Sequence, residues 1–329
     1  VDIKWELDAA NANDNVGGDV AEAMPDKLGV SYLTGGLNWQ ALYRGQLNPS
    51  MDLLSLSGKV DLQNATDRDF KTDRLRLVSG DLRINSPRPN PSLMRKQTMA
   101  MEMAVSAEQD GATSVSTPTS LGDRNVYEVE NTKVVPANSS VKFDLFKPVQ
   151  IPVKAEYHLS WFMPWGRGQT EEDAIIERPE IVLKLENSDE NGLGIPLPQG
   201  QVGFYIGEGN NASSDAIFLV EDMLPAAQPG QKLRFNLGRS HDISIRHVQK
   251  SYEIKSNQPR EVEVSYDVIL ENSKDKPVTL NVRDHLSGQV KILKSSAEFK
   301  TVSDQAVDWQ VTVPANGRYV ISYSAQVKR

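Results

Sequence analysis

The 329-residue chain contains no cysteine, which excludes disulfides, thiolate metal sites and cysteine nucleophiles together. Histidine is scarce, with 4 residues, and none of them stands in the His-Glu-x-x-His spacing of zinc proteases. No run approaches the roughly 18 consecutive apolar residues that a membrane-spanning helix needs, so we predict no transmembrane segment. The sequence therefore lacks the motifs of enzymes with a cysteine nucleophile, of His-Glu-x-x-His zinc proteases and of helical membrane transporters.

Positive charge is in deficit. The chain has 36 Lys and Arg against 44 Asp and Glu, for a formal net charge of −8. Because nucleic-acid affinity rests mainly on basic contacts to phosphate, we predict no nucleic-acid partner. The chain begins at Val1, with neither the charged nor the apolar segment of a secretory leader, so we expect a mature form whose targeting segment, if it had one, is gone.

Turn-forming residues are plentiful and stand mostly between apolar runs, which is typical of many short strands. In the stretch from 180 to 207, residues 180–186 alternate apolar and polar side chains as a strand does, and the polar cluster that follows them favours a turn. Strands are predicted at 30–33, 37–47, 53–62, 75–84, 126–135, 141–146, 151–161, 180–186, 202–206, 217–220, 232–237, 243–248, 251–254, 261–271, 278–285, 290–293, 307–313 and 319–327.

These patterns predict an all-β fold with two or more antiparallel β-sandwich units. We expect a strand and polar tail in 1–28, a β-rich domain in 29–215 and a C-terminal β-sandwich domain in 216–329. An insertion at 86–125 interrupts the first domain as a long, partly helical or mobile loop. From about residue 260 the length and turn spacing are typical of an immunoglobulin-like sandwich. The assignment also leaves open that the two β-rich blocks interlock.

Three strands end in the same way. Asn64, Asn187 and Asn272 each close an alternating strand just before a polar turn. An internal duplication would explain this recurring pattern, and so would the general preference of asparagine for the start of a turn. The sequence leaves both explanations open.

Several segments resemble a known family. They are Gly29–Tyr43, Leu56–Thr66, Leu75–Asp81, the strand from Tyr127, Val141–Phe146, Tyr266–Val278 and, most specifically, the Gly-Leu-Gly-Ile-Pro-Leu-Pro run within Asn187–Gly200. Together they are similar to the bacterial family called domain of unknown function 4139, over nearly everything from Gly29 to Arg329. The resemblance implies an all-β protein of the cell envelope or exterior, in the periplasm, at the cell surface or outside the cell. It implies no catalytic residue.

The densest aromatic patch of the sequence is a candidate interaction site. Trp161, Phe162 and Trp165 stand together, with Arg167 beside them. Such rings can stack on a sugar or anchor a partner protein, and they can equally plug a gap between the sheets of a sandwich.

The sequence offers only weak candidates for metal and dinucleotide sites, and we predict no catalytic residue and no cofactor. Met99, Met101 and Met103 have the soft thioethers that suit Cu(I), but methionine is equally a flexible packing residue. The Gly-x-Gly-x-x-Ala pattern at 207–212 would need a helix after it to hold a dinucleotide, and the sequence there predicts a strand. A surface calcium site on Asp189 and Glu190 stays open. There is no Gly-x-Ser-x-Gly elbow.

Three functions fit these observations. The first is a non-enzymatic structural or protein-interaction protein that contacts itself or another envelope protein through strand edges or the aromatic patch. The second is a carbohydrate- or peptide-binding module that uses the same aromatic residues. The third is a hydrolase whose site is assembled from distant carboxylates.

Overall fold

The computed structural model describes residues 34–72, 74–80, 115, 118–129, 134–164, 173–207 and 216–328. The chain divides into two compact units, residues 1–35 and 36–329, and the description below concerns the second. Apart from one 3₁₀ turn, η1 (Asp189–Asn191), the regular structure of the described residues consists of strands. None of these residues forms a helix that is long and apolar enough to cross a membrane. The expected strand and tail at 1–28 and the strand expected at 30–33 lie outside the described residues, and so does the expected insertion at 86–125 apart from residues 115 and 118–125.

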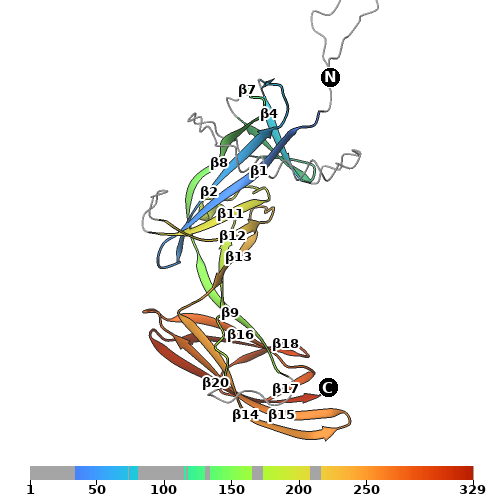
Figure 1. Cartoon of the computed structure of the whole chain (residues 1–329), viewed down its shortest axis with the longest axis vertical. Coiled ribbons are helices and arrows are strands. Elements are labelled where there is room, and N and C mark those ends of the chain that lie inside the picture. Colours follow the sequence, from blue (N-terminus) through green and yellow to red (C-terminus); the bar gives the residue numbers. More distant parts are fainter. Residues whose placement is uncertain are drawn as a thin grey trace, which may run out of the picture. The chain divides into compact units, whose positions relative to one another are not determined.

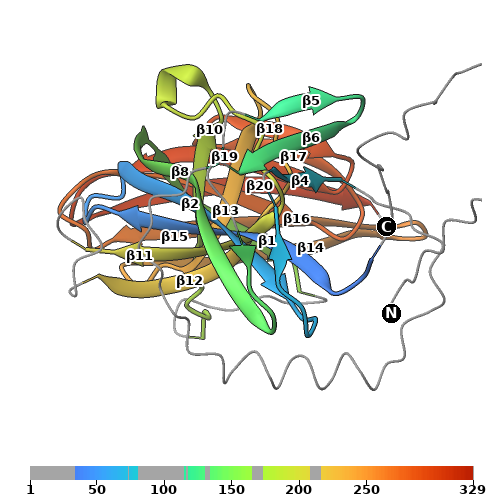
Figure 2. The same ribbon diagram turned by 90° about the horizontal axis from the view of Figure 1, so that it is seen from above.

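Two sheets and one short strand pair carry the first half of this unit. Nearest neighbours in the five-stranded sheet are antiparallel except for one pair, β1 with β11, which runs parallel (Figures 1 and 2). Its order is β12 (Ile217–Leu224), β11 (Gly200–Ile206), β1 (Leu37–Leu47), β2 (Leu53–Asn64) and β8 (Ser139–Pro152). The three-stranded sheet has the order β4 (Leu75–Ser79), β6 (Arg124–Val129), β5 (Thr119–Leu121), and β3 (Phe70–Lys71) pairs with β7 (Val134–Val135).

A six-stranded and a four-stranded sheet carry the rest. The six-stranded sheet contains the second parallel pair, β9 with β16 (Figure 1). Its order is β13 (Lys232–Arg239), β10 (Glu180–Glu186), β9 (Lys154–Phe162), β16 (Val278–His285), β19 (Ala306–Val313) and β18 (Phe299–Ser303). The four-stranded sheet has the order β14 (Ile243–Asn257), β15 (Arg260–Asn272), β20 (Gly317–Lys328), β17 (Gln289–Ser295).

The sheets enclose two apolar cores, because alternate side chains of each strand point inward. The first core contains Leu54 and Val60 of β2 together with Phe204 and Phe235, whose ring centroids lie 5.1 Å apart. The second core contains Trp309 and the inward face of β15. Five alternate side chains of β15 are buried on that face: Val262, Val264, Tyr266, Val268 and Leu270. The prediction of an all-β fold built from sandwich units is confirmed.

Strand pairing crosses the expected domain boundary at residue 216. β12 pairs with β11, and β13 pairs with β10, so strands from both sides of residue 216 share two sheets. The boundary itself stays a prediction, and the option that the two β-rich blocks interlock agrees with this pairing.

Two of the three strand-ending asparagines have matching surroundings. The amide nitrogen of Asn64 donates to the carbonyls of residues 68, 135 and 136, and its amide oxygen accepts from the backbone N–H of residue 66. Asn272 donates to the carbonyls of residues 276, 313 and 314 and accepts from the N–H of residue 274. Both side chains are buried. The buried Asn187 differs, because its amide nitrogen donates to Ile195 and its amide oxygen has no hydrogen-bond partner among the described residues.

The correspondence extends to the strands around these two residues. The sequence Val-Pro-Ala-Asn occurs at 135–138 and at 313–316, and Asn138 and Asn316 have φ of 48° and 45°. β8 begins just after the first copy and pairs with β2, as β20 begins after the second and pairs with β15. The order β4-β6-β5 is matched by β16-β19-β18. Agreement in sequence, backbone conformation and connectivity favours a duplication over a turn preference of asparagine alone.

Candidate functional site on the outer face of β9 and β16

The parallel pairing of β9 and β16 sets three outward-facing residues of each strand side by side. Because successive side chains of a strand alternate between faces, His158 and Phe162 point outward while Leu159 is buried. The register places Asn281 beside His158, Arg283 beside Ser160, and His285 beside Phe162. The outer face is therefore polar over most of its length and aromatic at one end.

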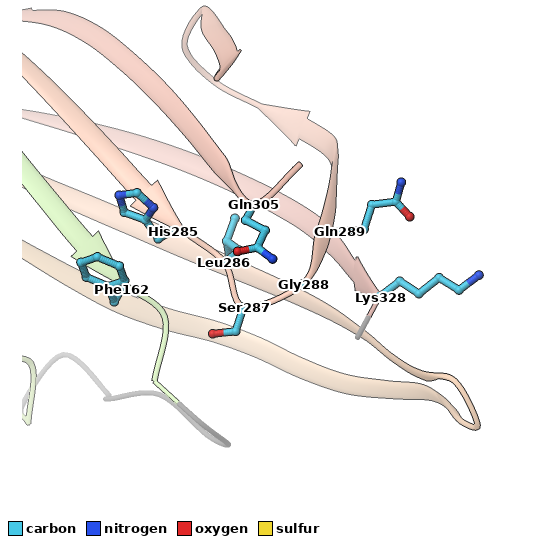
Figure 3. A pocket seen from close by; sticks show the side chains of 8 residues that line it. All are labelled: Phe162, His285, Leu286, Ser287, Gly288, Gln289, Gln305 and Lys328. Carbon is cyan, nitrogen blue, oxygen red and sulfur yellow. The ribbon is translucent and has the colours of Figure 1, made fainter. Parts of the chain in front are cut away.

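The aromatic end is the most exposed part of this face. The Phe162 side chain is 69% exposed, and its ring stacks on the imidazole of His285 with centroids 4.4 Å apart and planes 10° apart. Figure 3 shows the two rings facing each other from the ends of neighbouring strands. They border a hollow of about 520 Å³ whose other side is formed by residues 286–289, Gln305 and Lys328. An exposed phenylalanine beside a shallow hollow is typical of a contact surface, since burying it removes apolar area from water.

A second hollow of about 550 Å³ lies over the polar part of the face. Arg283 reaches it and forms two hydrogen bonds to Asp308, at 2.6 and 2.7 Å. Arg234 and Arg239 enter it from β13. Ile175 and Ile176 line its rim and are 65% and 56% exposed. Arginine is enriched at protein–protein interfaces, so arginines beside exposed apolar side chains are typical of a surface that contacts another protein.

Glu156, His158 and Ser160 share the outward face of β9 and are the residues of this region closest to a catalytic arrangement. Glu156 is buried and accepts hydrogen bonds from Lys184 at 2.7 Å and from Asn281 at 3.4 Å, and it lies 3.1 Å from the His158 ring. Burial acts to raise the pKa of Glu156, but the hydrogen bonds from Lys184 and His158 outweigh it and hold that pKa below its usual range. Burial lowers the pKa of His158 despite its contact with Glu156. The carboxylate is thus held as an ion by its neighbours.

This group lacks the geometry of nucleophilic catalysis. The His158 ring contacts Glu156 and Asn281, and among the described residues no hydrogen bond joins it to Ser160. The Glu156 carboxylate is also already engaged by Lys184 within the sheet. Among the described residues, no group of three or more His, Asp or Glu side chains could hold a metal ion.

The inward side of the same strands carries a buried charge network that sequence reasoning missed. His247 lies 3.0 Å from Asp284 and 3.2 Å from Glu177, and Tyr323 donates to Asp284 at 2.7 Å. Burial acts to lower the pKa of His247, but Asp284 and Glu177 outweigh it and raise that pKa to about 9. The Trp161 ring stacks on the imidazole, with centroids 4.1 Å apart. His247, Asp284 and Tyr323 are buried in the second core, whereas Glu177 is partly exposed and also lines the second hollow.

The predicted aromatic patch therefore divides between the two faces of β9. Trp161 packs against the second core and also contacts the Tyr266 ring edge-on, at 5.2 Å between centroids. Of the patch members that the structure describes, Phe162 is the one presented to solvent. Trp165 and Arg167 lie outside the described residues, as do Met99, Met101 and Met103.

Two other sequence candidates fall in turns or strands of ordinary geometry. The candidate calcium ligands Asp189 and Glu190 both lie in η1, and a left-handed glycine at 192, with φ of 75°, ends that turn. A calcium site there stays a prediction. The strand predicted after the Gly-x-Gly-x-x-Ala pattern is confirmed from Ile217 onward as β12.

The comparisons with known proteins identify a family whose function is unknown. No curated protein matches the chain. A family described as a domain of unknown function, DUF4139, matches residues 28–329. That match covers nearly the whole chain and confirms the resemblance found in the sequence. The chain therefore belongs to the DUF4139 family.

Proposed function

We propose that this protein is a non-enzymatic interaction protein of the bacterial cell envelope or exterior, and that it binds a partner protein through the outer face of β9 and β16. The observation that supports this most strongly is the exposed Phe162 ring, stacked on His285 beside a hollow of about 520 Å³. Phe162 is the anchor, and the arginines of the neighbouring hollow supply polar contacts around it. The envelope location and the immunoglobulin-like character of the second sandwich belong to the same proposal.

The test compares two exposed apolar side chains. Wild-type protein, Phe162→Ala and Leu121→Ala are immobilised and used to capture proteins from an envelope fraction of the source bacterium. Leu121 is 72% exposed in the hairpin of β5 and β6, so it is a matched control away from the site. We expect one discrete protein to be retained by wild type and Leu121→Ala and lost with Phe162→Ala. Equal retention by all three proteins would contradict the proposal.

A glycan-binding module is the second candidate, because an exposed aromatic ring is also a surface on which a sugar ring can stack. Screening the same three proteins against immobilised glycans separates the two. Glycan binding that depends on Phe162, without any captured protein, would replace the first proposal with the second.

The hydrolase alternative is tested by measuring the turnover of common hydrolase substrates by wild type and by Glu156→Gln. Any turnover of a common hydrolase substrate that Glu156→Gln abolishes, in a variant that keeps its fold, would overturn the non-enzymatic assignment.

A further inference from the structure

Two strand edges on different sandwiches carry exposed apolar side chains and opposite charge. The acidic edge is β12, the end strand of the five-stranded sheet. The basic edge is formed by β17 and β18, the end strands of the four-stranded and six-stranded sheets. An edge strand presents unpaired backbone N–H and C=O groups, so it accepts a further strand unless its side chains prevent it.

The acidic edge is strongly apolar. Its exposed side chains are Ile217 at 67%, Phe218 at 54%, Leu219 at 37% and Met223 at 48%. Short edges, lysines and prolines are the usual devices that keep edges from pairing, and β12 contains no lysine or proline.

The two acids of β12 have different roles. Asp222 accepts hydrogen bonds from the backbone N–H groups of Met223, at 2.8 Å, and of Asn236 on β13, at 3.1 Å. It is therefore engaged within the chain, and it closes that end of the strand against β13. Glu221 is exposed, and it supplies the negative charge on the part of β12 that Asp222 does not close against β13.

The basic edge complements these properties. Its exposed apolar side chains are Leu293 at 40%, Phe299 at 45% and Val302 at 44%. Its two strands contain no acid and three exposed lysines, Lys291, Lys294 and Lys300. The exposed acids Glu298 and Asp304 flank β18 on either side. The two strands belong to one side of the second sandwich, because Val290 donates to the carbonyl of Asp304 at 2.7 Å and the Trp309 indole donates to Ser295 at 3.1 Å.

We propose that the acidic edge of one molecule binds the basic edge of a second copy of the same chain. Pairing an edge with its own copy would bring like charges together, Glu221 with Glu221 or lysine with lysine, which is unfavourable across a strand pair. Pairing the two different edges brings opposite charges and exposed apolar side chains together. An interface between unlike surfaces does not close on itself as a two-fold dimer does, so assembly continues head to tail into a ring or filament.

This assembly deepens the proposed interaction function by naming a second copy as one partner. Its surface overlaps the hollow beside Phe162 at Gln289, the first residue of β17, and none of the residues substituted in the tests below lines that hollow. The two proposals can therefore fail separately. Wild-type protein that stays monomeric and still captures a partner through Phe162 would overturn the assembly and leave the other proposal standing.

The test is sedimentation of the full chain across a range of protein concentrations, at low and at high salt. We expect the mass to rise beyond two copies with concentration and to fall at high salt, because surface charges are screened. A wild type that remains monomeric at all concentrations, or stops at two copies, would overturn the proposal.

Charge reversal identifies the edges. Glu221→Lys alone, or Lys294→Glu with Lys300→Glu, should weaken association about tenfold. The controls Glu190→Lys and Lys59→Glu change the same charges at exposed positions on other elements and should leave association unchanged. A chain that carries all three edge reversals has opposite charges facing again, so it should recover association. Failure of this recovery, or equal effects of the controls, would overturn the pairing.

Discussion

His247 carries its charge inside an apolar core, between Asp284 at 3.0 Å and Glu177 at 3.2 Å. The sequence contained a signal for this pairing that periodicity alone does not interpret. His247 follows Ile243 and Ile245 on the inward face of β14, and Asp284 follows Leu280 and Val282 on the inward face of β16. An ionisable residue at an inward position needs a partner, and two of them with opposite charge on neighbouring sheets satisfy each other. What the sequence could not supply was that these two strands face each other.

The His247 network predicts a pH dependence of stability. The pKa of His247 in the folded protein, about 9, lies above its ordinary value of 6.5, so the folded state holds the proton more tightly than the unfolded chain does. The resulting stabilisation is fully present below about pH 6.5 and is lost as the pH rises through about 9. Between pH 6 and pH 10 the difference in unfolding free energy between wild type and His247→Gln should shrink by on the order of 3 kcal/mol.

Denaturant unfolding of both proteins across this range provides the check. Taking the difference removes the contributions of other groups that titrate in the same range. A difference that stays constant from pH 6 to pH 10 would show that His247 does not gain a proton-linked stabilisation on folding.

The two matching asparagines predict matching losses of stability. Asn64→Ala and Asn272→Ala each leave several buried backbone groups without a hydrogen-bond partner, so each should lower the unfolding free energy by about 2–4 kcal/mol. The exposed Asn257 at the end of β14 is the control, and Asn257→Ala should change it by less than about 0.5 kcal/mol. Urea unfolding measures all three, and a loss confined to one of the two buried positions would contradict their equivalence.

At the scale of strands, sequence periodicity predicted the buried alternating strands well and the irregular ones poorly. The predicted bounds of 37–47 and 278–285 coincide with β1 and β16. The break predicted between strands 243–248 and 251–254 is wrong, because both segments belong to one strand, β14, with bulges that shift its register near residues 250 and 255. β18 was missed because all of its residues are exposed, so its sequence shows no alternation. The parallel pairs were not predicted, since they join strands far apart in the chain.

The parallel contact between β1 and β11 depends on the absence of one side chain. A Cβ atom at Gly200 would lie 2.1 Å from the carbonyl oxygen of Ala41, a backbone atom that cannot move without separating the strands. Gly200→Ala should therefore destabilise the protein by on the order of 3 kcal/mol.

Gly203 on the same strand is the control, because a Cβ there meets only the ring of Tyr205, at 3.3 Å. Gly203→Ala should cost less than about 1 kcal/mol. Equal midpoints of urea unfolding for the two variants would show that the close approach of β1 and β11 does not constrain residue 200.

At the scale of the whole molecule, the described residues enclose two apolar cores filled by side chains, and the candidate site lies on the outer face of one sheet. The fold class and the family could be predicted from the sequence, because strand periodicity and the Gly-Leu-Gly-Ile-Pro-Leu-Pro run are local features. The candidate site was predicted in part. Phe162 lies where the sequence indicated an aromatic patch, but its neighbours His285 and Arg283 come from a strand more than 100 residues away in the chain, so no local pattern could place them there.

Site-specific photo-crosslinking in the source bacterium measures whether the face around Phe162 binds a partner protein. A photoreactive phenylalanine analogue is placed at position 162 and, as a control on the exposed part of another sheet, at position 59. We expect one discrete crosslinked product from position 162 and none from position 59. No product at 162, or the same products from both positions, would contradict the proposed binding.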